Sequence, residues 1–368
     1  MPAAYQPLYD HLASDLDAYE SAVDAMPDAP ASTPLVKGAE LLAANGNRLA
    51  GLLAPNTLGL VDESLDRLHA LHVGGVTLGI KVPMLLDSFS PDAGRYADFY
   101  ATVAEHVRAR GMVVSVELGV LFCGTAFAQC TNPYGAGTYQ SFVDDTVAQA
   151  RIVIERLHPD YLTLVAEPDT EAKLTGIRVL GTPTGAARAV GDILAGIGER
   201  GSTRVGAGAG TWLPTSFADA IAAEPVDYLD THTYPVGGGV GANAVAIAAV
   251  AQRAHLSLVV DEVWLYKTDQ PGIAGGPAAA EQVFRQDVYS FWEPLDERFL
   301  AITSKWAHKA GAAYVSPFWS WQFFTYLDWS PQLDAAPYAQ LTQAFNRVVA
   351  PALTSSQTTA VGHQWGDQ

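Results

Sequence analysis

Two apolar runs in the sequence each lead to a glutamate: Tyr161-Leu-Thr-Leu-Val-Ala-Glu167 and Leu256-Ser-Leu-Val-Val-Asp-Glu262. Each run has the length and composition of a buried strand, and the segments around them alternate between strand-like and helix-like patterns. This alternation predicts parallel strands joined by helices and closed into a (β/α)8 TIM barrel of the α/β class. Side chains at the C-terminal ends of barrel strands face the mouth, so both glutamates are expected there.

Six further segments complete the predicted barrel. The expected strands lie at residues 36–42, 76–80, 112–117, 161–166, 203–207, 226–231, 256–261 and 313–318. Helical patterns lie at residues 58–72, 93–110, 138–157, 183–199, 215–223, 242–254, 278–310 and 336–350. Gly38 interrupts the first strand pattern, which makes this strand the one with the least support.

The barrel is expected to form a single catalytic domain over residues 31–353. Residues 4–26 carry apolar side chains at helical spacing and are followed by a proline-rich connector, which predicts an N-terminal helical extension over residues 1–30. Residues 354–368 are polar and are expected to form a frayed C-terminal tail.

A doubly wound sheet is the alternative fold. It normally carries a Gly-rich phosphate-binding turn after its first strand. The Gly-rich segment Gly206-Ala-Gly-Ala-Gly210 instead follows the fifth expected strand and lacks the G-x-G-x-x-G spacing. We interpret it as a loop that keeps bulky side chains out of the mouth.

Charge and composition exclude several classes of partner. The 368 residues carry 21 Lys and Arg against 39 Asp and Glu, a formal net charge of −18, so nucleic acid and anionic membranes are not expected partners. No apolar run approaches the roughly 20 residues of a membrane span. The acidic surface suits a neutral carbohydrate and favours secretion, although the first residues lack the pattern of a signal peptide. The sequence does not indicate the oligomeric state.

Cys123 and Cys130 are the only cysteines and fall in one predicted loop. A disulfide between them would close a small ring, and two free thiols are the alternative. Cys and His do not cluster at the spacing of a structural zinc site, so no metal or other cofactor is expected.

Polar and aromatic side chains follow most of the expected strands and should converge at the mouth. They are Lys81, Glu117, Glu167, Asp169, His232, Tyr234, Asp261, Glu262, Trp264, Trp319 and Trp321. Aromatic rings stack on the apolar faces of sugars, while carboxylates and imidazoles bind hydroxyl groups. A pair of carboxylates can supply the acid/base and the nucleophile that hydrolyse a glycosidic bond. The set therefore predicts a carbohydrate-active site.

This arrangement resembles clan A of the retaining glycoside hydrolases, a (β/α)8 superfamily that includes cellulase-like and endo-mannanase families. The resemblance covers roughly residues 36–350 as spaced motifs: Ala166-Glu167-Pro168, His232-Thr-Tyr234, Asp261-Glu262, Lys81-Val-Pro83 and the tryptophans after strand eight. It implies that Glu167 is the acid/base, that Glu262 is the nucleophile, and that Tyr234 hydrogen-bonds the nucleophile. With the other side chains at the mouth, the expected substrate-binding residues are Lys81, Glu117, His232, Tyr234, Trp264, Trp319 and Trp321.

The mechanism that the resemblance implies is double displacement on a β-linked oligosaccharide or polysaccharide. Glu262 would attack the anomeric carbon while Glu167 donates a proton, and Glu167 would then activate the water that releases the sugar. The two carboxyl groups should lie about 5–5.5 Å apart, and Glu167 should hold its proton near the working pH.

The chain departs from the clan A pattern at two positions. Ala166 replaces the Asn that usually precedes the acid/base, so the hydrogen bond of that Asn to the sugar 2-hydroxyl is absent or supplied elsewhere. Lys81 replaces the usual Arg, which gives a single-point donor in place of a rigid fork. Both departures indicate a divergent member or an altered sugar preference.

Several of these residues also have a structural interpretation. Glu117 can pair with Lys81, and Asp169 can cap the turn that it begins. Asp261 points to the opposite side of the strand from its neighbour Glu262, and it is expected to form a structural ion pair.

Three other functions would use the same features. A metal-dependent sugar isomerase or epimerase would take Glu117, Glu167, His232 and Glu262 as ligands, but the end of the fifth strand offers no acidic ligand. A Schiff-base aldolase would use Lys81, because Lys173 and Lys267 are expected in loops. A carbohydrate-binding barrel that lacks catalysis is the third alternative.

The sugar and its linkage are not indicated by the sequence. Long loops at residues 119–137 and 265–277, together with the additional tryptophans, favour an open cleft that suits endo cleavage.

Overall fold

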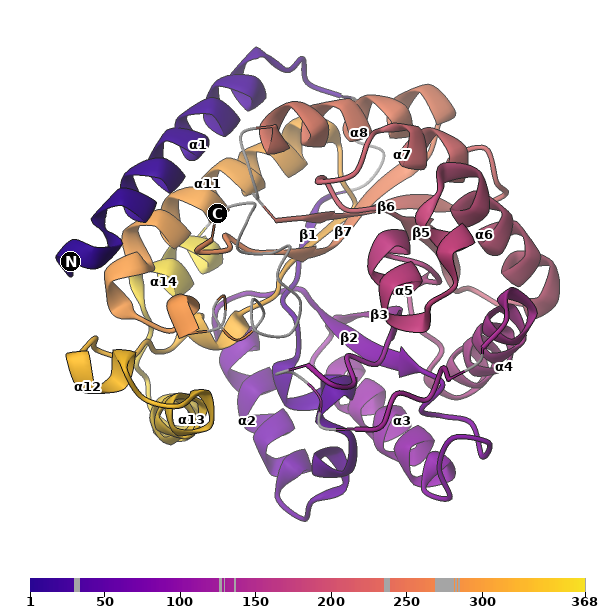
Figure 1. The fold of residues 1–368 in the computed structure, drawn as a ribbon, viewed down its shortest axis with the longest axis horizontal. Coiled ribbons are helices and arrows are strands. Elements are labelled where there is room, and N and C mark those ends of the chain that lie inside the picture. Colours follow the sequence, from indigo (N-terminus) through magenta and orange to yellow (C-terminus); the bar gives the residue numbers. More distant parts are fainter. Residues whose placement is uncertain are drawn as a thin grey trace.

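The computed structural model describes residues 1–29, 34–125, 128, 130–135, 137–234, 239–268, 281, 283 and 285–367. Eight parallel strands form one sheet in the order β1-β8-β7-β6-β5-β4-β3-β2, and helices surround it (Figure 1). The strands are β1 Val36–Lys37, β2 Gly75–Val82, β3 Val113–Val120, β4 Tyr161–Thr163, β5 Arg204–Gly208, β6 Tyr228–Thr233, β7 Ser257–Val263 and β8 Tyr314–Pro317. The predicted (β/α)8 TIM barrel is confirmed.

The barrel closes through the residues that follow β1. β1 pairs with β8. The residues after β1 then bond to β2: the Ala39 N–H donates to Gly75 O at 3.2 Å, and the Thr77 N–H donates to Ala39 O at 3.1 Å. The first strand predicted at residues 36–42 is therefore shared between two neighbours, and its regular part is only Val36–Lys37.

Twelve α-helices lie in the described part of the chain, and most match the predicted segments. They are α1 Gln6–Ala25, α2 Thr57–Ala70, α3 Ala93–Ala109, α4 Tyr139–Leu157, α5 Pro168–Thr175, α6 Pro183–Ile197, α7 Ser216–Ile221, α8 Val240–Ala254, α11 Glu293–Ala310, α12 Pro331–Asp334, α13 Tyr338–Thr354 and α14 Ala360–Asp367. Local signals set several starts: a capping box of Thr138 and Ser141 begins α4, and Thr182 caps α6. Of the long helix predicted over 278–310, residues 278–280, 282 and 284 lie outside the described residues.

The N-terminal extension forms α1, which packs along α11 and α8 at the outside of the barrel (Figure 1). Its apolar stripe of Leu12, Leu16, Tyr19 and Val23 is buried, as the helical spacing predicts. None of the described helices is long and apolar enough to cross a membrane.

The prediction of a frayed C-terminal tail is wrong. Residues 360–367 form α14, and the Trp365 side chain is fully buried. The Trp365 indole donates to Gly38 O at 3.1 Å, and the Lys37 ammonium donates to Trp365 O at 2.6 Å. One large aromatic side chain thus anchors a segment whose composition is otherwise polar.

The glycines of β5 serve packing inside the barrel, which corrects our interpretation of Gly206–Gly210 as an open loop. Gly206 and Gly208 belong to β5, and a Cβ atom on Gly206 would lie 2.3 Å from the buried Tyr228 ring. A Cβ atom on Gly208 would lie 2.0 Å from Asp230 O. The absence of side chains lets β6 and its aromatic ring approach closely.

Asp261 does not form the predicted ion pair but is satisfied by hydroxyl groups. Its carboxylate accepts hydrogen bonds from Ser115 Oγ and Thr163 Oγ1, each at 2.6 Å. Burial raises the pKa of Asp261 to about 6. Hydroxyl donors replace a cation because β3 and β4 place short polar side chains opposite this position.

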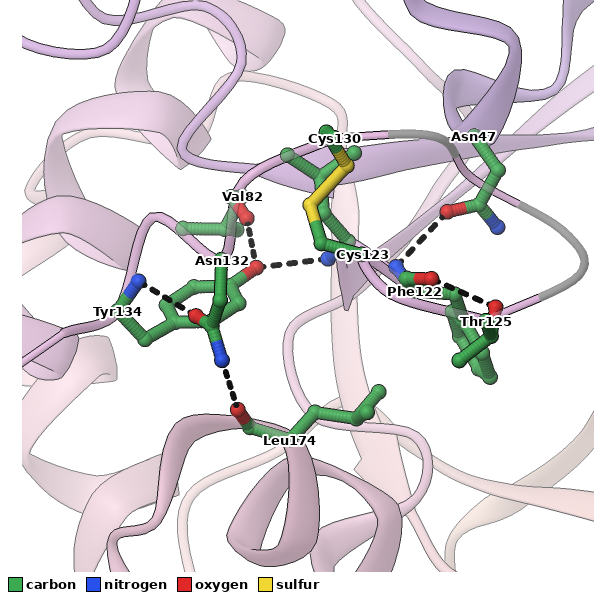
Figure 2. The surroundings of a disulfide bond; sticks show 10 residues. Asn47, Val82, Phe122, Cys123, Thr125, Cys130, Asn132, Tyr134 and Leu174 are labelled. Carbon is green, nitrogen blue, oxygen red and sulfur yellow. Dashed lines mark hydrogen bonds between the residues drawn. A yellow bond between two sulfur atoms is a disulfide. The ribbon is translucent and has the colours of Figure 1, made fainter. Parts of the chain in front are cut away.

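Cys123 and Cys130 form a disulfide, which decides between the two alternatives left by the sequence (Figure 2). Hydrogen bonds tie the surrounding loop to its neighbours: the Phe122 N–H donates to Asn47 Oδ1 at 3.0 Å, and Tyr134 donates to Val82 O (Figure 2). The loop after β3 is therefore fixed against the end of β2. Residues 126, 127, 129 and 136 of the predicted loop 119–137, and residues 269–277 of the loop 265–277, lie outside the described residues.

Candidate active site

The two glutamates that define the predicted site lie at the C-terminal ends of β4 and β7. Glu167 follows the buried residues Leu164–Ala166 and takes the N-cap position of α5, a helix that Pro168 begins. Glu262 lies one residue before the end of β7. It is in register with His232 on the adjacent strand β6. The Glu167 side chain is 20% exposed, and Glu262 is also partly exposed, so both can be reached from the mouth.

Residues of β6 connect the two glutamates. His232 Nδ1 lies 2.9 Å from Glu167 Oε1, and the Tyr234 hydroxyl donates to Glu262 Oε1. The second imidazole nitrogen, Nε2, lies 3.5 Å from Glu117 Oε2 and 3.6 Å from Asp230 Oδ2. The His-x-Tyr motif therefore contacts both glutamates, and the hydrogen bond between Tyr234 and Glu262 is the one that the resemblance implies.

Lys81 is a buried residue of β2, and its ammonium group adds a positive charge to the site. Its ammonium group lies 3.4 Å from Glu117 Oε1 and 5.9 Å from the centre of the Phe122 ring. A Cβ atom on Gly119 would lie 3.0 Å from Lys81 Nζ, so the glycine makes room for the ammonium group. Lys81 and Glu117 are 5% and 4% exposed, which makes them an ion pair beneath the site.

Sequence reasoning missed four polar residues of the site. Glu40, Glu171 and Asp230 interact with Glu117, and Tyr266 stacks on Tyr234. Glu40 follows β1 and accepts a hydrogen bond from Asn45 Nδ2 at 3.0 Å, and burial together with Glu117 raises its pKa to about 8. Glu171 lies one helical turn after Glu167 on α5, and its i, i+4 spacing was a usable signal.

The pKa values of the two glutamates shift in opposite directions, and that of Glu167 differs from the prediction. Burial would raise the pKa of Glu167, but the hydrogen bond and the charge of His232, together with Thr170 and Lys81, lower it below its ordinary value of 4.5. Burial raises the pKa of Glu262 to about 8, with Glu117 and Glu167 adding to the shift and His232 opposing it. The expectation that Glu167 holds its proton in the free site is therefore wrong, because His232 lies closer to Glu167 than sequence reasoning could foresee.

Electrostatic attraction keeps the two basic groups charged despite their burial. Burial alone would lower the pKa of His232, but Glu117, Glu167 and Glu262 raise it well above 6.5. For the same reason the pKa of Lys81 is raised above 10.5 against its desolvation. The floor of the site thus carries an imidazolium and an ammonium among several carboxyl groups.

The predicted aromatic residues divide between the mouth and the core. Trp264 is fully buried in the hydrophobic core, with the Lys267 ammonium 5.1 Å from the centre of its ring, so the prediction that it contacts substrate is wrong. Trp319 is 6% exposed, whereas Trp321 is partly exposed. Trp212 is partly exposed and donates from its indole to Asp169 Oδ2 at 3.0 Å, which gives Asp169 a partner beyond the turn that it was expected to cap.

A metal site is also compatible with part of this geometry. Ligand atoms of Glu117, His232 and Glu262 lie within 4.8 Å of one another. The Lys81 ammonium, however, lies at Glu117 and supplies the positive charge that a cation would bring.

The two other lysines that the sequence placed in loops have different surroundings. Lys173 is exposed and lies in helix α5, which corrects its predicted position. Lys267 is fully buried and pairs with Asp287 and Asp296, so its ammonium group is not a free amine for Schiff-base chemistry.

Comparison with known proteins shows the fold. No family model and no curated sequence matches the chain. Among solved structures, the exo-beta-1,4-mannosidase Op5Man5 from Opitutaceae bacterium strain TAV5 superposes with a TM-score of 0.60 at 12% identity, covering 94% of this chain and 61% of that chain. This chain therefore spans less than two thirds of the mannosidase.

Two further structures have the same architecture. The GH5_18 protein from Bifidobacterium longum subsp. longum ATCC 55813 gives a TM-score of 0.55 at 12% identity, covering 91% of this chain and 78% of that chain. It has also been solved as a variant in complex with Manb1-4GlcNAc. The beta-glucosidase from Thermotoga maritima gives 0.51 at 12% identity, covering 79% and 89%. The chain thus has the (β/α)8 fold of these glycoside hydrolases.

The role of the buried ion pair between Lys81 and Glu117 can be tested by substitution. Replacing Lys81 by Gln removes the cation from a cluster of buried carboxylates, and we expect the free energy of unfolding to fall by about 3 kcal/mol. Urea denaturation at pH 7 measures this change. Lys305→Gln is the matched control, because Lys305 pairs with Asp24 at the exposed surface, where loss of a charge pair leaves stability unchanged. Equal stability of Lys81→Gln and wild type would contradict the assigned role.

Proposed function

We propose that this protein is a retaining glycoside hydrolase that cleaves β-linked oligosaccharides or polysaccharides by double displacement. The observation that carries the proposal is the joining of Glu167 and Glu262 by one motif on β6: His232 contacts the first, and Tyr234 donates to the second. Both carboxyl groups reach the mouth, while the basic groups that balance them lie beneath. The fold of the solved glycoside hydrolases supports the proposal.

In the proposed first step, Glu262 attacks the anomeric carbon and the glycosidic oxygen leaves with a proton from Glu167. The hydrogen bond from Tyr234 holds the Glu262 carboxylate in one orientation. In the second step, Glu167 removes a proton from water, which attacks the anomeric carbon and releases Glu262. In the free site the shared proton lies on Glu262, whose pKa is about 8, so it must move to Glu167 before Glu262 attacks as a carboxylate, while His232 stays protonated.

The proposal also names the sugars that the enzyme is expected to accept. β-Mannosides are the first substrates to test, because one structural neighbour is an exo-beta-1,4-mannosidase and another was solved with Manb1-4GlcNAc. Trp321 and Trp212 are the partly exposed aromatic residues that we propose to stack on sugar rings. A secreted location would fit an enzyme that acts on extracellular polymers.

A metal-dependent sugar isomerase is the second candidate, because Glu117, His232 and Glu262 lie at ligand spacing. It differs from the first in two measurable ways. An isomerase would change monosaccharides without releasing reducing ends, and its activity would require a divalent cation.

The proposal predicts the outcome of a reducing-end assay on β-mannan, β-glucan, xylan, galactan and aryl β-glycosides. Wild type should release product from at least one of them with or without EDTA, and Glu167→Ala and Glu262→Ala should each lose at least a hundredfold in kcat/KM, the contribution typical of an acid/base or nucleophile. Asp219→Ala, which removes an exposed carboxylate paired with Arg253, is the control and should leave the rate unchanged. No release of reducing ends, together with conversion of a monosaccharide that EDTA abolishes and Mn²⁺ or Mg²⁺ restores, would support the isomerase instead.

A second prediction concerns the pH dependence of kcat/KM. Turnover requires one proton shared by Glu167 and Glu262, whichever carboxyl group carries it in the free site. Because the pKa of Glu167 is lowered and that of Glu262 is about 8, the form with one proton persists from below pH 4.5 up to about pH 8. As the pH rises through about 8, this last proton leaves and the rate should fall.

The variant Tyr234→Phe tests which group sets the alkaline limb, because it removes the hydroxyl that donates to Glu262. A carboxylate without its donor binds protons more tightly, so the alkaline limb of this variant should move to higher pH. A wild-type alkaline limb near pH 5 would contradict the assignment.

A further inference from the structure

Tyr266, in the loop after β7, is partly exposed and stacks on a residue of the site, although the sequence did not single it out. Leu265 and Lys267 on either side are fully buried, whereas Tyr266 is partly exposed. Its ring stacks on that of Tyr234, with centroids 4.0 Å apart and an angle of 21° between the planes. Because Tyr234 donates to Glu262, this stack places Tyr266 beside the proposed nucleophile.

A buried ion cluster fixes the loop around Tyr266. The Lys267 ammonium lies 2.9 Å from Asp287 Oδ1, also pairs with Asp296, and donates to Leu265 O at 2.7 Å. Asp296 in turn accepts from the Tyr326 hydroxyl at 2.9 Å. The backbone on both sides of Tyr266 is therefore anchored, and a side chain held in this way loses little entropy when it binds a ligand.

The phenol of Tyr266 is suited to donate a hydrogen bond. Burial and the charges of Glu262 and Glu167 raise the pKa of Tyr266 well above 10, so the hydroxyl keeps its proton. Lys81, Glu117, His232 and Tyr234 are at most 5% exposed, whereas Glu167, Glu262 and Tyr266 are partly open. A sugar that reaches the two glutamates therefore meets Tyr266 before it meets the buried groups.

We propose that Tyr266 is a substrate-binding residue whose hydroxyl donates a hydrogen bond to a hydroxyl group of the sugar that Glu262 attacks. This inference rests on the proposed function and names a residue that determines which sugar the site accepts. The role differs from that of Tyr234, whose hydroxyl is already used by Glu262. The ring of Tyr266 also covers one face of Tyr234 and so shields the hydrogen bond to Glu262 from water.

The test compares wild type with Tyr266→Phe on the aryl β-glycoside that is hydrolysed fastest and on its monodeoxy analogues. Tyr266→Phe keeps the ring stack and removes only the hydroxyl. We expect kcat/KM on the parent glycoside to fall about tenfold, the loss typical of one hydrogen bond. On the analogue that lacks the partner hydroxyl, wild type and variant should have equal kcat/KM.

The matched control is Tyr139→Phe, which removes a hydroxyl that donates to Asp192 at 2.6 Å on the outside of the barrel, and which should leave all rates unchanged. Thermal unfolding of each variant verifies that it is folded. An equal loss on every analogue, or no loss on any, would overturn the inference while leaving the proposed function intact. A wild type that hydrolyses no glycoside overturns the proposed function and this inference with it.

Discussion

The imidazole of His232 lies between Glu167 on one side and Glu117 and Asp230 on the other, and the rest of the site depends on the positive charge that it carries. Burying a charge without a partner costs several kcal/mol, so a barrel that gathers this many carboxyl groups must either protonate them or pair them. His232 and Lys81 pair some of them. Burial raises the pKa values of Glu40, Glu171 and Asp230, and neighbouring carboxylates add to the shifts.

The barrel fold brings these charged groups together at the proposed active site. Parallel strands bring their C-terminal ends together, and residues from β2, β3, β4, β6 and β7 contribute to one cluster. Gly119 leaves the space into which the Lys81 ammonium extends. The two glutamates that remain open to the mouth are the ones that act on the sugar in the proposed reaction, while the groups that set their charge stay out of contact with solvent.

The sequence predicted the barrel and the two glutamates because strand–helix alternation and strand-end carboxylates are local patterns. It also predicted the contact between Tyr234 and the carboxylate of Glu262, through the resemblance. It could not predict that Trp264 is buried or that Trp365 anchors the C-terminal helix, since both depend on which distant surfaces meet. The lowered pKa of Glu167 likewise results from a contact between β4 and β6 that no local pattern encodes. Tyr266 could not be predicted as a site residue, because a residue in a loop carries no periodic signal. Its position is set by its neighbours Leu265 and Lys267, which are buried in the core.

In double displacement Glu262 forms a covalent bond with the sugar, and mass spectrometry can detect this bond. A 2-deoxy-2-fluoro β-glycoside with a good leaving group slows the second step more than the first, so a retaining enzyme accumulates the glycosyl-enzyme intermediate. We predict that one fluorosugar attaches to each molecule and that peptide mapping places it on Glu262. A label on another residue, or turnover of the parent glycoside by an enzyme that never accumulates the label, would contradict the account.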